Sequence, residues 1–170
     1  MAQFDSVPLE IRHVRVEFDA AFDPFVAQLQ RVLGQLDPEG FTMMASDPTA
    51  ARKKLEDSQG EQGLMLFSSQ NHGGVFALHG KIRKAVRLHI GNPLIAFEMT
   101  QHDIRAGLYA PLSVLIYESA PEAVTVEFDL PSSQLAQFGN ANVDTVARSF
   151  DEKLEAVLER AASLARKSST

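Results

Sequence analysis

The sequence has no cysteine among its 170 residues. Without a thiol, the chain cannot form a disulfide, a zinc–thiolate site, a cysteine-ligated iron–sulfur cluster or a cysteine nucleophile. A chain free of cysteine fits a reducing compartment. We therefore expect an intracellular, cytoplasmic protein.

Long apolar runs and an excess of positive charge are also missing. No apolar stretch approaches the roughly 20 residues of a membrane-spanning helix, and residues 1–10 lack the basic start and apolar stretch of a signal peptide. Lys and Arg number 16 against 22 Asp and Glu, which gives a net charge of −6. Such a balance offers no general attraction to a phosphate backbone. We expect neither a membrane nor a nucleic acid as a partner.

The length and the hydrophobic content of the chain suit one folded domain. A chain of 170 residues with 45% hydrophobic side chains is typical of a single globular unit. A chain of this length buries a core without needing a covalent staple. We expect one domain over residues 1–170.

Five segments have the patterns of β-strands. Residues 11–18 and 124–128 alternate apolar with polar side chains, as in half-exposed strands. Residues 112–117 are nearly all apolar, which predicts a central strand buried on both faces. Residues 64–67 and 85–90 are shorter candidates.

Three segments predict helices. Asp23-Pro24 and Asn92-Pro93 are start signals for helices over residues 24–36 and 93–105, because the Asx side chain caps free N–H groups and Pro fits the first turn. Gly107 is expected to stop the second of these helices. Residues 143–166 carry a long apolar stripe, with Asn142 as the expected cap.

Two segments are expected to lie outside this regular framework. Residues 37–62 are predicted to be an expanded, mobile excursion, in which Asp47-Pro48 can start a short helix. Residues 167–170 are predicted to fray.

These elements predict an α+β fold, a two-layer sandwich in which a mostly antiparallel sheet is packed by amphipathic helices. The apolar strand over residues 112–117 and the apolar helix faces exceed what one thin helical layer covers. We therefore expect a homodimer.

Three runs of residues carry a resemblance to a known family. They are Ile90-Gly91-Asn92-Pro93, the stretch 107–118 and Phe128-Asp129-Leu130-Pro131, followed by the long final helix. In this order and spacing the chain resembles the DUF302 family of domains of unknown function, clearly over residues 63–162 and more loosely over 11–36. The resemblance implies an α/β sandwich with helices on one side of a mainly antiparallel sheet, and small dimeric proteins. It transfers no catalytic residue, because none is established for the family.

The resemblance also bears on a segment with ambiguous pattern. Asn71-His72 stands where the family often has Asp-His opening a short helix. It therefore favours a helix over residues 71–80. Asn in place of Asp removes the charge that a carboxylate–histidine pair would need there.

The first functional hypothesis is a non-enzymatic binding or regulatory module for a small polar or anionic ligand. At Gly91-Asn92-Pro93 a strand ends and a helix begins, so free N–H groups and the helix dipole converge on one point. The site would lie near Asn92, Arg105 and Tyr117. The alternative is that Asn92 caps the helix and the corner is purely structural, a role the sequence favours.

The second hypothesis uses histidine. His72, His79, His89 and His102 lie within the part that resembles the family, and imidazoles can bind zinc, copper or haem iron. None shows the paired spacing of a helical metal site, and half-buried core histidines are common. No cofactor is evident from the sequence, and metal or haem binding stays the alternative reading.

The third hypothesis is a small acid–base enzyme. Glu98, His102 and Arg105 follow helical spacing and can pair along one helix face. With Tyr117 in a shared cleft they could transfer protons, whereas the simpler interpretation is a solvated helix face. The candidate ligand-binding residues are therefore Asn92, Glu98, His102, Arg105 and Tyr117, and the sequence leaves open whether the protein is an enzyme.

Overall fold

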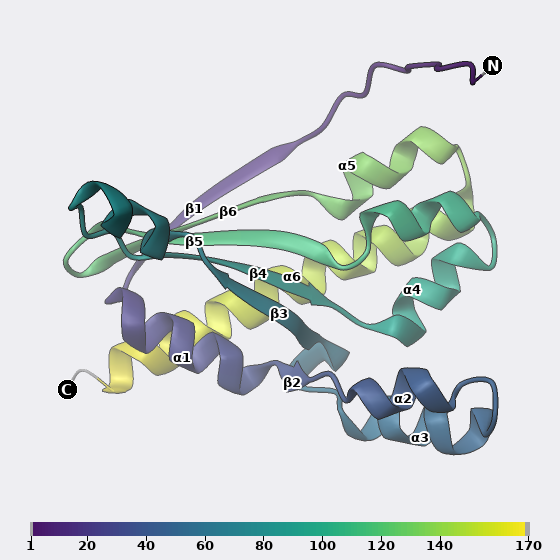
Figure 1. Cartoon of the computed structure of the whole chain (residues 1–170), viewed down its shortest axis with the longest axis horizontal. Coiled ribbons are helices and arrows are strands. Elements are labelled where there is room, and N and C mark those ends of the chain that lie inside the picture. Colours follow the sequence, from purple (N-terminus) through teal and green to yellow (C-terminus); the bar gives the residue numbers. More distant parts are fainter. Residues whose placement is uncertain (1, 169–170) are drawn as a thin grey trace.

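The computed structural model describes residues 2–168 and shows a six-stranded sheet with helices packed against it (Figure 1). The strand order is β1-β6-β5-β4-β3-β2, and every neighbouring pair is antiparallel except β2 with β3. The strands are β1 (His13–Asp19), β2 (Gly34–Gln35), β3 (Met65–Asn71), β4 (Ala85–Gly91), β5 (Leu112–Ala120) and β6 (Ala123–Asp129). The predicted α+β fold with a mostly antiparallel sheet is confirmed.

The helices differ widely in length. The α-helices are α1 (Phe22–Val32), α2 (Pro38–Met43), α3 (Pro48–Asp57), α4 (Pro93–Thr100), α5 (Pro131–Leu135) and α6 (Ala141–Ser168). Short 3-10 helices are η1 (Glu61–Gly63), η2 (Gly73–His79), η3 (Ile104–Tyr109) and η4 (Ala136–Phe138). In the described part of the chain, none of the helices is long and apolar enough to span a lipid bilayer.

The core lies between one face of the sheet and the helices α1 and α6. In Figure 1, α6 runs behind the sheet, and the face turned toward the viewer has no layer of helices over it. Leu88 on β4 and Val114 on β5 point into the core, where they share one buried cluster with Leu29 of α1 and Leu154 of α6. Burying a side chain of this size stabilises the fold by about 1.5–3 kcal/mol.

The strand β5 is buried on one face only. Leu112, Val114 and Ile116 are buried, whereas Ser113, which lies between the first two, is exposed. Leu115 and Tyr117 on the same face as Ser113 are only half-buried. The prediction of a strand buried on both faces is therefore wrong, and it no longer supports a homodimer.

The first two predicted helices end earlier than their apolar patterns indicate. The helix predicted over 24–36 stops at Val32, because the Gly34 N–H donates to the Leu64 carbonyl at 2.9 Å and draws the chain into β2. The helix predicted over 93–105 stops at Thr100. There Asp103 accepts a hydrogen bond from the Arg105 N–H at 3.0 Å and opens η3, in which the expected stop residue Gly107 lies.

The long final helix begins two residues before its predicted start. The Asn140 side chain, and not that of Asn142, accepts from the N–H groups of residues 142 and 143. At the other end, residues 167 and 168 belong to α6, so the predicted fraying does not include them. The rest of that prediction, residues 169–170, lies outside the described residues.

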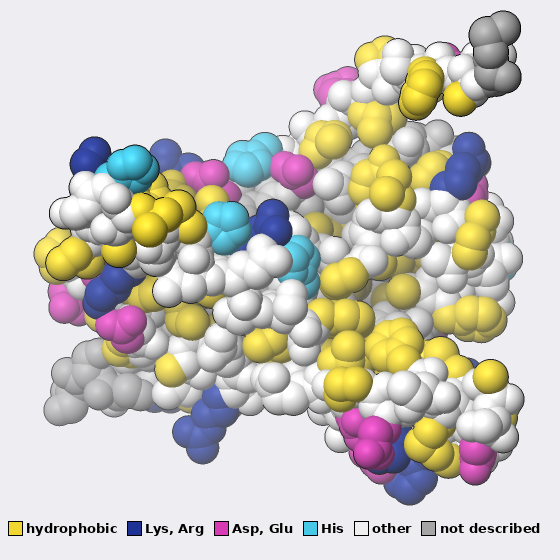
Figure 2. Space-filling model, in the orientation of Figure 1, with side chains coloured by type: hydrophobic (Ala, Val, Ile, Leu, Met, Phe, Trp, Pro, Cys, Tyr) yellow, Lys and Arg dark blue, Asp and Glu magenta, His cyan; other side chains and the backbone are white. Residues whose placement is uncertain are grey.

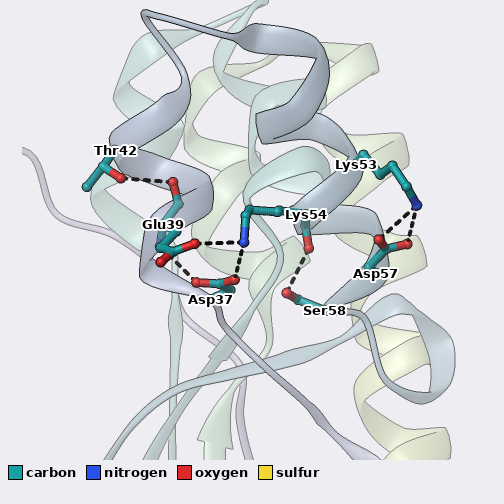
Figure 3. A network of polar contacts seen from close by, with 7 residues as sticks. All are labelled: Asp37, Glu39, Thr42, Lys53, Lys54, Asp57 and Ser58. Atoms are coloured by element: carbon teal, nitrogen blue, oxygen red, sulfur yellow. Dashed lines mark hydrogen bonds and ion pairs between the residues drawn. The ribbon is translucent and has the colours of Figure 1, made fainter.

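The segment 37–62 holds two helices, α2 and α3, which pack against each other (Figure 3). Asp37 caps α2 by accepting from the Glu39 N–H at 2.9 Å. The Lys54 ammonium of α3 binds the carboxylates of Asp37 at 3.2 Å and Glu39 at 2.8 Å. The hydrogen bond from the Glu39 N–H, followed by Lys54, lowers the pKa of Asp37. A charged cap thus joins the two helices.

The base of this α2–α3 pair is a close crossing of two backbone segments at Gly34 and Gly60. Both N–H groups donate to the Leu64 carbonyl, at 2.9 and 3.1 Å. A Cβ atom on Gly60 would lie 2.1 Å from the Gly34 nitrogen, and one on Gly34 would lie 1.8 Å from the Ser58 oxygen. The obstruction is backbone on both sides, so no side-chain rotation can relieve it.

The buried side chain of Asn92 fastens the end of β4 to the chain before β3. Its amide nitrogen donates to the Gly63 carbonyl at 2.6 Å, and its oxygen accepts from the Leu94 N–H at 2.8 Å. The residue is only 3% exposed. Both halves of the amide are therefore used inside the protein, one to cap α4 and one to satisfy a distant carbonyl.

We predict that Gly60→Ala lowers the free energy of unfolding by about 2–3 kcal/mol, because the added methyl group forces the crossing backbones apart. Gly107→Ala is the matched control, since its Cβ would meet only Thr100 Cγ2 at 3.6 Å, an ordinary contact. Urea unfolding of both variants measures the difference. Equal stability of the two variants would contradict the steric argument.

We predict that Asn92→Asp destabilises the protein by about 1–3 kcal/mol at neutral pH, because a carboxylate oxygen then faces the Gly63 carbonyl in place of a donor. Burial beside that carbonyl raises the pKa of the introduced carboxyl in the folded state. The loss of stability relative to the wild type should therefore grow as the pH rises above the unfolded-state pKa of about 3.9. Urea unfolding at pH 4.5 and 7.5 tests this, with Asn92→Ala as the control that introduces no titrating group. A difference that is the same at both pH values would count against it.

Candidate functional site

The predicted ligand-binding residues do not meet in one place. Asn92 follows the last residue of β4, whereas Tyr117 pairs with Ala85 at the other end of that strand. Seven residues of strand at about 3.3 Å each separate the two positions by roughly 20 Å. The cavity beside Asn92 measures only about 20 Å³ and is lined mostly by apolar side chains such as Ile95 and Met99. That is room for about one water molecule.

The predicted set of Glu98, His102 and Arg105 is also divided. Because α4 ends at Thr100, His102 and Arg105 lie beyond the helix that was expected to align them with Glu98. Within residues 2–168, Glu98 and His102 form no ion pair with each other. Arg105 bonds instead to Asp103 at 2.6 Å and stacks over the Phe138 ring, 4.8 Å from its centroid.

The predicted histidine ligands are dispersed as well. His72 precedes η2, His79 is its last residue, and His89 lies on β4 facing the uncovered side of the sheet. Over the residues that the structure describes, no three His, Asp or Glu side chains form a group that could hold a metal ion. The described part of the structure therefore supplies no three-residue ligand set for the metal hypothesis.

The uncovered face of the sheet does gather polar side chains, in rows that cross the strands. Figure 2 shows histidine and charged side chains on this face. The first row holds His13, Asp129, Ser113, His89 and Ser68, which come from β1, β6, β5, β4 and β3. We call these five residues the binding row. The second row holds Arg15, Glu127, Leu115, Arg87 and Gln70. A bulge between Leu66 and Ser68 in β3 aligns Ser68 with His89.

One end of the binding row is an acid–imidazole network. His13 Nδ1 lies 2.7 Å from Asp129 Oδ1, and its Nε2 lies 3.3 Å from Glu127 Oε2. The Tyr117 hydroxyl donates to Glu127 Oε1 at 2.7 Å. The hydrogen bond to Asp129 raises the pKa of His13, and the Tyr117 hydroxyl lowers the pKa of Glu127. The network therefore favours a protonated imidazole held between two carboxylates.

The other end of the binding row is a hydroxyl–imidazole pair. Ser68 Oγ lies 2.8 Å from His89 Nδ1. Burial, together with the nearby Arg87, lowers the pKa of His89. A neutral His89 that accepts the Ser68 proton at Nδ1 carries its own proton on Nε2. The pKa values of the two histidines of the row are therefore shifted in opposite directions.

A cavity of about 160 Å³ opens beside the middle of the binding row. Its walls are Ser113 and Asp129 of the row, Gln134, and the segment that leads from Leu108 to Leu112. One water molecule needs only about 10–15 Å³ of such volume, so the cavity can hold several waters or a small ligand. It offers a carboxylate, a hydroxyl and an amide side chain.

The sequence pattern shows which side chains of each strand share a face, but it does not show which strands lie side by side. The alternation in β1 and β6 places His13, Arg15 and Glu17 on one face, and likewise Glu127 and Asp129. It does not show that β1 pairs with β6, a contact across more than 100 residues of chain. The pairing alone turns these separate polar faces into one site.

The fold has a counterpart among solved structures. An uncharacterized conserved DUF302 protein from Bacillus stearothermophilus matches 88% of this chain and 97% of its own, with a TM-score of 0.61 and 13% sequence identity. This likeness concerns the fold alone. No curated protein matches the sequence.

A family model gives the assignment. The model for the domain of unknown function DUF302 matches residues 41–161, from within α2 to the last third of α6. The match takes in the strands β3, β4, β5 and β6, and hence four of the five residues of the binding row. The chain therefore belongs to the DUF302 family, as its Gly-Asn-Pro corner and its central strands indicated.

Proposed function

We propose that the protein is a binding module that takes a small polar ligand on the uncovered face of its sheet. The observation that carries the proposal is the 160 Å³ cavity that Asp129 and Ser113 border at the middle of the binding row. The row is fixed before any ligand binds, because His13 holds Asp129 at 2.7 Å and the strand pairing holds Ser113 opposite His89. Side chains fixed in advance lose little conformational entropy on binding.

The charges around the cavity favour a ligand with little net charge. Arg15 of the second row lies on β1, next to the strand that carries Glu127 and Asp129. Arg87 lies on β4, two strands away from them. Positive and negative side chains are therefore mixed on this face, which does not suit a polyanion. Asp129, Ser113 and Gln134 offer both acceptors and donors. The ligand class that fits is a small amine, amino acid or polyol.

The same geometry argues for binding in preference to nucleophilic catalysis. Ser68 and His89 form a hydroxyl–imidazole pair, but an activated serine also needs a group that orients the base. Within the described chain, His89 makes no hydrogen bond to a carboxylate. Asp129, the carboxylate of the binding row, is held by His13 at the other end.

We predict that Ser113→Leu weakens ligand binding at least tenfold, because the larger side chain fills the cavity. Two-dimensional 1H–15N NMR with a panel of small amines, amino acids, polyols and carboxylates identifies the binding compounds by shifts at Ser113, His89 and Asp129. Ser119→Leu is the matched control, since Ser119 is exposed on the same strand about 20 Å away. The proposal fails if no compound shifts these resonances, or if both variants bind the active compound equally.

We predict that the two histidines of the binding row titrate on opposite sides of the usual value of about 6.5. The hydrogen bond to Asp129 raises the pKa of His13, and burial lowers the pKa of His89. The imidazole resonances followed by NMR between pH 4.5 and 9 measure both values. In Asp129→Asn the pKa of His13 should fall while that of His89 stays unchanged. A His13 pKa at or below that of His89 would show that the network does not hold in solution.

A further inference from the structure

The strand β1 forms an edge of the sheet with one side unpaired. It pairs with β6 and with no other strand. In Figure 1 it lies along the upper margin of the sheet, with no other element on its outer side. Proteins protect such edges with short strands, prolines or charged side chains, above all lysine. β1 has seven residues, His-Val-Arg-Val-Glu-Phe-Asp, with neither a proline nor a lysine, and its charged side chains are of both signs.

The order of charges along β1 is complementary to itself in the antiparallel direction. The basic side chains His13 and Arg15 come first and the acidic side chains Glu17 and Asp19 come last, with Val16 in the middle. An antiparallel pair of β1 strands centred on Val16 sets His13 opposite Asp19 and Arg15 opposite Glu17. Opposite charges in facing positions stabilise a strand pair, and like charges destabilise it. In-register parallel pairing would set like charges against each other.

The acidic side chains of β1, Glu17 and Asp19, are not engaged in ion pairs within the described part of the molecule. The basic half already lies near acids of β6, with Arg15 3.7 Å from Glu127 and His13 2.7 Å from Asp129. Pairing with a second copy would give the two free carboxylates partners.

The apolar side of β1 is also incompletely covered. Val14, Val16 and Phe18 point toward the helix layer but are only half-buried. They line a cavity of about 200 Å³ together with Phe128 of β6 and with Glu155, Leu158 and Glu159 of α6. In the antiparallel arrangement, Val14 faces Phe18 of the partner subunit, and Val16 faces its own copy across the two-fold axis. Apolar surface that α6 leaves open is then covered on both subunits.

We propose that β1 pairs antiparallel with β1 of a second copy of this chain, centred on Val16, which joins two six-stranded sheets into one. The interface is isologous, as expected for a dimer with two-fold symmetry. It also joins the uncovered faces of the two sheets, so that each binding row meets the other subunit at His13. This proposal concerns the edge of the sheet and does not depend on ligand binding in the cavity.

Charge exchange tests the register of the strand pair. Sedimentation of the full chain at 1–200 µM should show a species of twice the 18.7 kDa monomer. Arg15→Glu and Glu17→Arg should each raise the dissociation constant at least tenfold, because each sets like charges opposite each other. The double variant Arg15→Glu/Glu17→Arg keeps the strand self-complementary and should restore the dimer. Glu98→Arg, with the same change of charge on α4, is the control and should leave the dimer intact.

A cysteine placed at the two-fold axis tests the contact directly, because the chain has no other thiol. Val16→Cys should form an intersubunit disulfide with diamide, since facing residues of an antiparallel pair have Cα atoms about 4.5–5.5 Å apart. His13→Cys is the matched control, as its two copies would lie roughly 20 Å apart and should not cross-link. Circular dichroism confirms that each variant is folded.

Three results would overturn the proposal. One is a wild-type mass of 18.7 kDa at every concentration. Another is a dimer that neither single charge variant weakens, which would place the interface elsewhere. The third is a folded double variant that stays monomeric. None of these results bears on the ligand test, which is read at Ser113 in the middle of the sheet.

Discussion

The burial of the sheet on one face only is the constraint on which the rest of this structure depends. The helices α1 and α6 cover one side, where Leu88, Val114 and their neighbours are buried, and no helix layer covers the other. An antiparallel sheet tolerates this arrangement, because alternate side chains can be polar and hydrated. Every second residue of β1, β6, β5 and β4 faces that side, most of these residues are at least partly exposed, and polar side chains occupy most of the positions.

The polar side chains on this uncovered face are held by hydrogen bonds and are not merely solvated. Strand pairing brings His13 to Asp129 and His89 to Ser68, so four of the five side chains of the binding row have hydrogen-bond partners within the protein. The same pairing gives the two imidazoles different environments, one between carboxylates and one partly buried beside an arginine. A module that recognises a small ligand needs such fixed donors and acceptors around a cavity.

Hydrogen bonds between the strand ends explain why the Gly91-Asn92-Pro93 corner has a structural role. Asn92 uses both ends of its amide, on the Gly63 carbonyl and the Leu94 N–H. A short distance along the chain, Gly34 and Gly60 share the Leu64 carbonyl. These contacts join the ends of β2, β3 and β4 to the base of the α2–α3 pair. The Leu94 N–H and the Asn92 amide, which could have bound an anion at the corner, are therefore bonded within the protein itself.

The sequence by itself determined the fold class, the positions of five of the six strands, the cap at Asn92 and the amphipathic final helix, because each of these rests on local periodicity or on a local hydrogen bond. Only the tertiary structure decided that β1 lies beside β6, that β5 is buried on one face, and that the first helix stops at Val32. These features depend on contacts between residues far apart in sequence, such as the bond from the Gly34 N–H to the Leu64 carbonyl. Spacing within one segment carries no information about which distant strand will complete it. For that reason Tyr117 was foreseen as a candidate, whereas its partner Glu127 and the binding row were not.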